Sequence, residues 1–389
     1  MSDTVKIACV YFYLLDILTS KCYNFYTESR ERIAAVKHEF SAKDKEKLEK
    51  LEITRRRGFR LLDLYSNFLN LEPDFIKKEL IDELVSDCGV SVLEAYTAVL
   101  AAAFDIDSDE RDEDLIFENE YLKKSVELLD PDVYKSSSYL QKIKFPTVKR
   151  ANWEMRTSSY APFEAFVCRE ITVEDDLKEL PHIGFFTERF DFPSVFENGR
   201  EWMTVTPNEI ETMRSPLSEA HGRVITLGLG LGYFAHQASE KENVSSVTVI
   251  ERDESAISLF SEFILPQFEH KDKIKIIRAD ALEYLEKNDP EERFDFMFAD
   301  LWHDSSDGLA LYIKLKSIEK KQKREESSSL VRRYWIENSI LSRLRWLIYS
   351  EIVGENSKNL SITSYGELVK LLSNESLASI AGDIKNISL

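Results

Sequence analysis

The chain has 389 residues, of which 43% are hydrophobic and 31% are charged, and its formal net charge is −19. These values describe an ordinary soluble protein of two or three domains, each with ample core. The acidic balance argues against nucleic acid as the main partner, because a phosphate backbone is bound by a basic field.

The cysteines and the apolar runs indicate the compartment. The 4 cysteines lie far apart and form no C-x-x-C pair, which predicts free thiols in a reducing environment. No apolar run approaches the ~20 residues of a membrane span, and the first residues lack the pattern of a signal peptide. We therefore expect a cytoplasmic protein without membrane contact.

Residues 1–150 are expected to form a helical N-terminal domain. Residues 5–25 are apolar in a helix-compatible pattern, and residues 28–51 alternate in charge as a solvated helix face does. Ser91 and Glu94 form a capping box that opens a further helix.

Residues 151–206 are expected to form a small antiparallel β-element. Short segments rich in aromatic and β-branched residues are separated there by Gly, Pro and Asn, which is typical of strands and turns. These segments are 163–167, 184–186 and 201–205. Pro207 then opens a helix into the last predicted domain, residues 207–389.

The stretch from Val224 to Asp300 alternates strands with helices. The predicted strands are residues 224–227, 247–250, 275–277 and 294–298. Such alternation implies a Rossmann-like parallel sheet with right-handed crossovers. We therefore assign the chain to the α/β class, with the β-element and the helical domain preceding this sheet.

Glycines and acids follow the strands of this predicted sheet. Ligands of parallel sheets bind beyond the carboxyl ends of the strands, and glycines let the backbone approach a ligand closely. A helix N-terminus after the first turn adds unpaired N–H groups. The residues that the pattern places at this edge are Gly228, Gly230, Gly232, Glu251, Asp280 and Asp300.

Two classes of cofactor suit a Gly-rich turn with an acid at the end of the second strand. Residues 230–235 satisfy the dinucleotide pattern G-x-G-x-x-G/A, with Glu251 about where that pattern expects its acid. Residues 228–232 also form the G-x-G-x-G turn of class I S-adenosylmethionine-dependent methyltransferases, which this part of the chain resembles. Residues 278–282 have no counterpart in the dinucleotide fingerprint, and they favour S-adenosylmethionine as the cofactor.

The resemblance implies a role for each of these residues. Glu251 would bind the ribose, Asp280 and Ala281 would lie beside the adenine, and Asp300 would face the methionine moiety and the substrate. The family often places an acid two residues before the first glycine, where it holds the cofactor's amine. Here that position is Thr226, so the amine needs another partner or the ligand differs from the usual one.

A small β-element before such a domain resembles the spermidine-synthase-like branch of this superfamily, over roughly residues 163–307. Asn198–Gly199, a strand and a helix are similar to that family's Asp-Gly turn, strand and helix. The Gln expected after the turn is Trp202, the expected Tyr-His-Glu on the helix is missing, and the Asp-Ser-Ser-Asp after strand four is replaced by residues 300–304. Those residues grip the polyamine in the family, so the departures favour methyl transfer over aminopropyl transfer.

The segment after strand four offers groups for catalysis. Asp300, His303 and Asp304 are the predicted catalytic residues, because carboxylates and an imidazole bind a cationic substrate and move a proton. Asp307 is assigned to a turn, and His236 in the first helix is assigned to packing. No His, Cys or acid grouping has metal-ligand spacing, so no metal is expected.

Beyond this loop the sequence predicts a fifth strand and three helices, with no final hairpin. The helices are residues 309–321, 339–353 and 364–372, and the strand is 333–336. We expect an enzyme that transfers the methyl group of S-adenosylmethionine to a small-molecule acceptor, which the sequence does not identify. The alternatives are aminopropyl transfer from the decarboxylated cofactor and a non-catalytic cofactor-binding scaffold; a homodimer stays open.

Overall fold

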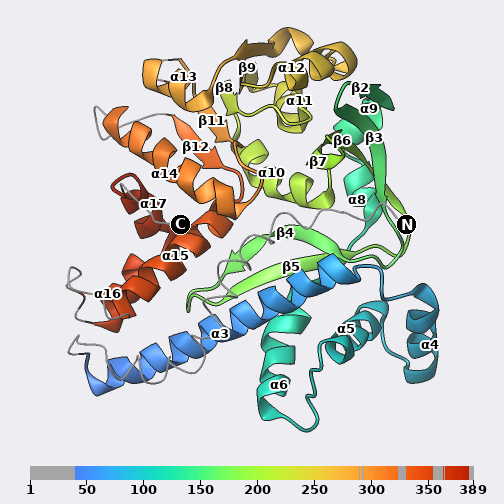
Figure 1. Cartoon of the computed structure of the whole chain (residues 1–389), viewed down its shortest axis with the longest axis vertical. Coiled ribbons are helices and arrows are strands. Elements are labelled where there is room, and N and C mark those ends of the chain that lie inside the picture. The colour runs from blue at the N-terminus through green and yellow to red at the C-terminus, as the bar shows by residue number, and fades with distance from the viewer. Residues whose placement is uncertain are drawn as a thin grey trace.

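The computed structural model describes residues 40–288, 290, 293–322, 330–353, 362 and 364–384. They form an α/β protein with a five-stranded, a four-stranded and a three-stranded sheet (Figure 1). The helix predicted for residues 5–25 and the beginning of the one predicted for 28–51 lie outside the described residues.

The N-terminal region is helical, as predicted, as far as residue 125. Its elements are α3 (Ala42–Leu71), α4 (Lys78–Cys88), α5 (Val92–Ala103), α6 (Asp112–Phe117), the π-helix η1 (Glu118–Leu122) and α7 (Lys123–Ser125). The capping box is confirmed: Ser91 Oγ accepts from the Glu94 N–H, and the Glu94 carboxylate accepts from the Ser91 N–H. Within the described residues no single helix is long and apolar enough to cross a membrane, although the bent pair α4 and α5 meets the criteria jointly.

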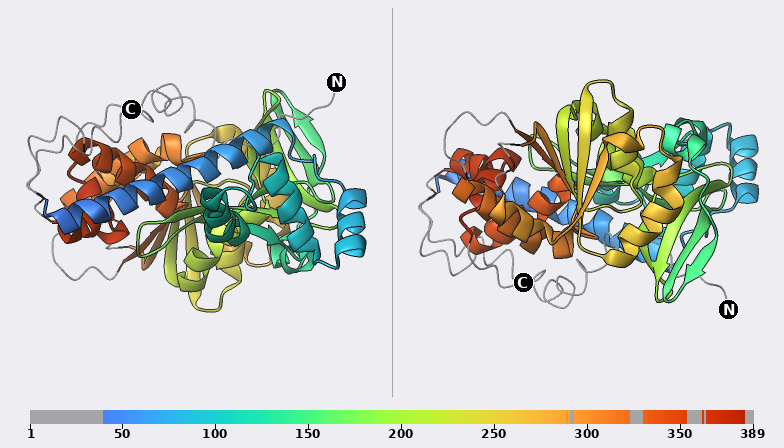
Figure 2. Two further views of the ribbon diagram at one scale, coloured as in Figure 1. Left: turned by 90° about the horizontal axis from the view of Figure 1, so that it is seen from below. Right: turned by 90° about the horizontal axis from the view of Figure 1, so that it is seen from above.

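The helical region shares its core with the strands that follow it. A short strand, β1 (Val126–Leu128), pairs in parallel with β5 (Glu179–Phe185). The ring of Tyr96 on α5 stacks on Phe185 with centroids 3.7 Å apart. The long α3 runs along β5 and across the molecule (Figure 2, left). Packing therefore crosses the sequence boundary at residue 150.

The β-region forms two sheets, where the sequence predicted one small antiparallel sheet. The strands are β2 (Val148–Arg150), β3 (Trp153–Tyr160), β4 (Phe166–Val173), β5, β6 (Phe190–Glu197) and β7 (Arg200–Thr204). Strands β2, β3, β6 and β7 pair in that order, whereas β4 and β1 flank β5. Phe163 has a φ of 64°, so the predicted strand at 163–167 begins in a turn and β4 starts only at Phe166. The local residue pattern predicts strands but does not determine which strands pair. Pairing between residues far apart in the sequence places these strands in two different sheets.

The C-terminal region contains the predicted Rossmann-like sheet. Its elements are α10 (Pro207–Glu219), β8 (Gly222–Leu227), α11 (Tyr233–Glu240), β9 (Val244–Glu251), α12 (Glu254–Leu259), η2 (Phe260–Ile264), β10 (Ile274–Arg278), α13 (Ala281–Lys287), β11 (Phe296–Ala299), α14 (Ser305–Gln322) and β12 (Val331–Tyr334). All strands are parallel, in the order β10-β9-β8-β11-β12. The helices α15 (Glu337–Val353), α16 (Tyr365–Leu371) and α17 (Asn374–Ala381) follow.

The strand order fixes where a ligand site can form. From β8 the chain builds outward to β9 and β10, and then returns to place β11 on the other side of β8. The edge between β8 and β11 is thus the topological switch point, where the loops after the two strands diverge. The Asp300 N–H donates to the Leu227 carbonyl at 2.8 Å. This hydrogen bond joins the ends of β8 and β11 at that edge.

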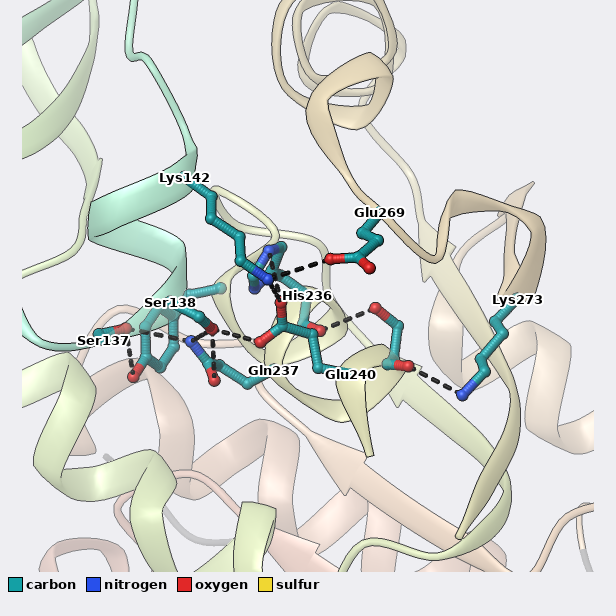
Figure 3. Close-up of polar contacts among 10 residues, drawn as sticks. Ser137, Ser138, Lys142, His236, Gln237, Glu240, Glu269 and Lys273 are labelled. Carbon is teal, nitrogen blue, oxygen red and sulfur yellow. Dashed lines mark hydrogen bonds and ion pairs between the residues drawn. The ribbon is translucent and has the colours of Figure 1, made fainter. Parts of the chain in front are cut away.

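Hydrogen bonds join α9 (Ser138–Lys142) to α11, which packs on the Rossmann-like sheet. Lys142 Nζ donates to Glu240 on α11 at 2.7 Å, and Gln237 Nε2 donates to Ser138 Oγ at 3.2 Å (Figure 3). Under this contact His236 is 1% exposed, with its ring edge-on to those of Tyr139 and Phe268. His236 is a packing residue, as the sequence predicted.

Candidate functional site

A cavity opens at the switch point and brings together residues from β7, α10, β8 and the loop after β11. Gly228, Gly230, Glu209 and Asp300 line it, together with Met203 and Thr226. Two of the three predicted glycines and one of the predicted acids therefore meet here. Its volume is about 20 Å³, which is room for about one water molecule.

The Gly-rich turn packs tightly against the protein itself. Gly228 has a φ of 99°, and a Cβ there would lie 1.9 Å from the carbonyl oxygen of Asp300. A Cβ on Gly232, which has a φ of 74°, would lie 2.2 Å from the Phe260 ring. At Gly230 the missing side chain makes space for the terminal methyl group of Met203. The glycines thus allow close packing of the turn, and Met203 occupies the space above Gly230.

Glu251 ends β9 beside this turn and is buried. Its Oε2 accepts from the Leu229 N–H at 3.1 Å, and its Oε1 accepts from the Asp253 N–H at 2.8 Å. A carboxylate has about four acceptor sites, so each oxygen retains the capacity for one further hydroxyl. Glu251 therefore joins the Gly-rich turn to the second strand and retains acceptors for a ligand.

Asp280 and Ala281 begin the next helix and do not line the cavity. Asp280 is the N-cap of α13, where its Oδ1 accepts from the N–H groups of Leu282 at 2.9 Å and Glu283 at 3.1 Å. This exposed carboxylate has a structural role, and the adenine contact implied by the resemblance stays a prediction.

We call three carboxylates the acidic cluster: Glu209 and Asp300, which line the cavity, and Glu201, whose charge acts on Glu209. Burial raises the pKa of Asp300 to about 7, with His303 opposing the shift and Glu251 adding to it. Burial and the charges of Asp300 and Glu201 raise the pKa of Glu209 well above its ordinary value. The pKa of Glu201 is raised to about 7 by burial, against the charge of Arg156. The charges of Asp300 and Glu201 thus disfavour ionisation of Glu209, and a bound cation would favour it.

Sequence reasoning missed Glu201 and Glu209. Glu209 lies in the first turn of α10, where an acid is common for helix stability alone, and Glu201 lies on the edge strand β7. Their proximity to Asp300 depends on how β7 and α10 pack against the sheet. The sequence feature that could have identified them is a pair of acids on the two sides of the short turn between an edge strand and a helix.

His303 and Asp304 follow Asp300, but neither lines the cavity. Asp304 is buried and its Oδ1 accepts from the Ser306 N–H at 2.6 Å, as a capping residue of α14 does. His303 is exposed with Nδ1 3.4 Å from Asp307 Oδ2, and this contact raises the pKa of His303. Asp307 also accepts from the His303 and Asp304 N–H groups and so organises this turn. Catalysis by His303 and Asp304 stays a prediction, whereas Asp300 lies in the cavity.

Position 226 is Thr, but other residues that line the cavity are acids and could bind an amine. Thr226 donates its hydroxyl to the Gly228 carbonyl at 3.3 Å. Glu209 and Asp300 line the same cavity, and its lining residues include no Lys, Arg or His. The site therefore offers partners for ammonium groups and none of opposite charge for a carboxylate.

The donor set fits a sulfonium nucleoside, whereas the cavity has room for about one water molecule and would have to widen considerably to hold one. Glu251 offers ribose acceptors and the acidic cluster offers cation partners. Met203 fills the space above Gly230. Its unbranched side chain lies on the edge strand β7, where a change of rotamer can open the cavity.

Comparisons with known proteins give a limited likeness. No family model and no curated protein match the chain. Among solved structures, the spermidine synthase from Thermotoga maritima matches at 19% identity over 33% of this chain and 48% of that chain, with a TM-score of 0.25. A spermidine synthase in complex with the transition-state analogue AdoDATO matches at 20% identity over 32% and 47%, with a TM-score of 0.24. The chain thus spans about half the length of these structures, and a likeness this low carries no argument about activity.

Proposed function

We propose that the protein transfers an alkyl group from a sulfonium nucleoside to an amine, and that the donor is decarboxylated S-adenosylmethionine. The supporting observation is the cavity lining, which contains Glu209 and Asp300 and no cationic side chain. A donor that keeps its carboxylate would place it among like charges, which is unfavourable in a partly buried site. An aminopropyl donor brings only positive charge. The sequence favours methyl transfer, whereas the charge of the cavity lining leads us to propose aminopropyl transfer.

Each acidic residue of the site would have its own role in this reaction. Glu251 would accept from the ribose hydroxyls, and Glu209 would hold an ammonium group of a substrate. The donor supplies a carbon bonded to a positively charged sulfur. The amine nitrogen's lone pair forms the new N–C bond, and the C–S bonding pair stays on sulfur as a neutral thioether. Asp300, with a pKa raised to about 7, would take the proton that the amine loses, because a base titrating near the working pH suits proton transfer.

Methyl transfer from S-adenosylmethionine is the second candidate, since the two donors share the ribose and adenine that Glu251 and the Gly-rich turn would hold. A scaffold without chemistry is the third, favoured by the small cavity and by the backbone contacts that already occupy part of Glu251. The two transfer reactions release different products from the donor, and a scaffold would release none.

The experiment offers each donor separately, with putrescine and with a simple monoamine as acceptors. The proposal predicts methylthioadenosine release from the decarboxylated donor, at ~1 s⁻¹ or faster as for ordinary enzymes. S-adenosylhomocysteine release from the other donor instead would establish methyl transfer. Binding of both donors by calorimetry without either product would support the scaffold, and Asp300→Asn serves as the inactive control.

A further inference from the structure

Helix α9 packs against α11, the helix that follows the Gly-rich turn, and it carries Tyr139. The Tyr139 side chain is fully buried, and its hydroxyl donates to the Leu231 carbonyl at 2.7 Å. Its ring lies edge-on to that of Tyr233, with centroids 5.5 Å apart. Leu231 and Tyr233 both line the cavity at the switch point. Tyr139 thus contacts two residues of the cavity lining from outside the cavity.

The Tyr139 hydroxyl supplies a donor that the backbone does not provide for the Leu231 carbonyl. Within the described residues no backbone N–H donates to this oxygen, and the His236 N–H in α11 donates to the Gly232 carbonyl instead, at 2.8 Å. Burial raises the pKa of Tyr139, so its hydroxyl stays protonated and remains a donor. A buried carbonyl without a donor is unfavourable, so this hydroxyl fixes the orientation of the peptide group between Leu231 and Gly232.

Hydrogen bonds connect that peptide group to Glu251. The same peptide group carries the Gly232 N–H, which donates to the Leu229 carbonyl at 2.9 Å. The Leu229 N–H in turn donates to Glu251 Oε2 at 3.1 Å. Tyr139 is therefore joined, through the Gly-rich turn, to the carboxylate that would accept from the ribose. A change in the orientation of the turn at its Tyr139 end would change the position of Glu251.

Further polar contacts hold α9 on α11 (Figure 3). Gln237 Nε2 donates to Ser137 Oγ at 3.0 Å, and Lys142 Nζ donates to Glu240 at 2.7 Å. The Lys142 side chain is 46% exposed, and an exposed ion pair contributes little to stability because water screens it. The buried Tyr139 side chain is consequently the part of α9 that acts on the turn.

Resting on the proposed function, we propose that Tyr139 is a positioning residue for donor binding, which fixes the Gly-rich turn and thereby the ribose-binding carboxylate of Glu251. Loss of the Tyr139 hydroxyl should then weaken nucleoside binding mainly where the Glu251 carboxylate is present. Because coupling between two sites is reciprocal, a bound nucleoside should also stabilise α9.

The first test measures binding of methylthioadenosine to the full chain by calorimetry. Tyr139→Phe removes the hydroxyl and keeps the ring, and it should raise the dissociation constant about threefold or more. In the Glu251→Gln background the same substitution should change the dissociation constant by less than about 1.5-fold, because coupled residues are not additive.

Two control variants separate this effect from a general loss of stability. Tyr65→Phe removes another buried hydroxyl, which is bonded to Ser125 in the N-terminal region. Lys142→Met removes the exposed ion pairs of α9. Both variants should bind methylthioadenosine within about twofold of the wild type.

The second test uses the wild-type protein alone. Saturating methylthioadenosine should slow amide hydrogen exchange in residues 138–143, while α5 serves as the reference segment and should exchange as before. This measurement stands even if Tyr139→Phe does not fold.

Two results would overturn this inference and leave the proposed function intact. One is an equal rise in the dissociation constant for Tyr139→Phe in both backgrounds, which would make Tyr139 a packing residue only. The other is unchanged exchange in α9 when methylthioadenosine binds. Absence of methylthioadenosine binding by the wild type would instead remove the proposed function, and this inference with it.

Discussion

The carbonyl oxygen of Asp300 lies 1.9 Å from the position that a Cβ on Gly228 would occupy. The first glycine of the turn and the acid after β11 are thus in direct backbone contact across the switch point. This contact places the Gly-rich turn directly against the loop that carries Asp300.

Gly228→Ala should therefore be strongly destabilising. The residue has a φ of 99°, which an L side chain rarely adopts, and the new methyl group would collide with backbone that cannot rotate away. We expect the free energy of unfolding to fall by about 3 kcal/mol or more, measured by urea denaturation. Gly366→Ala in α16 is the matched control, since nothing lies within 4 Å of its Cβ; it should be neutral or slightly stabilising. Equal stability of the two variants would contradict this account of the turn.

Glu251→Gln should weaken nucleoside binding while the protein stays folded. Charge-assisted hydrogen bonds to ribose contribute ~1.5–3 kcal/mol each, so loss of the charge should raise the dissociation constant for methylthioadenosine at least tenfold in calorimetry. Glu254→Gln, three residues further on at the start of α12 and paired with Arg278 on the surface, should bind as the wild type does. An unchanged dissociation constant in the Glu251 variant would reduce its role to holding the Leu229 and Asp253 N–H groups.

Asp300 and Asp304 should respond differently to substitution, although only three residues separate them. Asp300→Asn removes the proton acceptor and should lower kcat by a factor of ~10²–10⁴. Asp304→Ala removes a capping side chain and should cost ~1 kcal/mol of stability with kcat within a few-fold of wild type. The two are compared by steady-state kinetics and thermal unfolding. Loss of turnover in a folded Asp304 variant would instead support the catalytic role that the sequence predicts for it.

Glu209→Gln should stabilise the protein at alkaline pH. Burial and neighbouring charges raise the pKa of Glu209 well above 4.5, the ordinary value expected in the unfolded chain. From pH 4.5 upward the folded state then binds more protons than the unfolded state, so the free energy of unfolding falls as pH rises.

The Glu209→Gln variant should consequently have a higher Tm than wild type at pH 8, and the difference should vanish near pH 4. Glu211→Gln, on the same helix but paired with Arg214 at 2.8 Å, should show no such gain. A lower Tm for Glu209→Gln at pH 8 would mean that the carboxylate has a stabilising partner.

His236→Phe should make the protein less sensitive to acid. Burial lowers the pKa of His236 below 6.5, with Glu240 opposing and Lys142 and His270 adding to the shift. Neither ring nitrogen has a hydrogen-bond partner within the described chain. Below pH 6.5 the unfolded chain binds a proton that the folded state resists, so the free energy of unfolding falls as pH falls.

Phenylalanine keeps the edge-on contacts with Tyr139 and Phe268 and has no proton to gain. Thermal unfolding between pH 7.5 and 5 should show a shallower decline for His236→Phe than for wild type. His221→Gln, at a partly exposed position, should leave the slope unchanged. Parallel curves for wild type and His236→Phe would show that other groups, Glu240 among them, cause the acid sensitivity.

The sequence by itself determined the parallel sheet and the edge at which a ligand can bind. Period and composition predict each strand of residues 224–300 because buried parallel strands are continuous apolar runs, and the Gly-rich turn follows the first of them. The same local rules predicted the capping box at Ser91 and the helix that Pro207 opens, since both depend on residues a few positions apart.

Only the tertiary structure decided which side chains share the site. Glu209 is separated from Asp300 by about ninety residues, yet both line the same cavity, and the charge of Glu201 acts on Glu209. The pKa values of Glu201 and Glu209 depend on burial and on neighbouring charges. Burial and strand pairing are sums over distant contacts, so no local pattern encodes them. The sequence predicts Asp304 to be catalytic; only the structure shows that its carboxylate accepts from the Ser306 N–H at the start of α14, and the catalytic role stays a prediction.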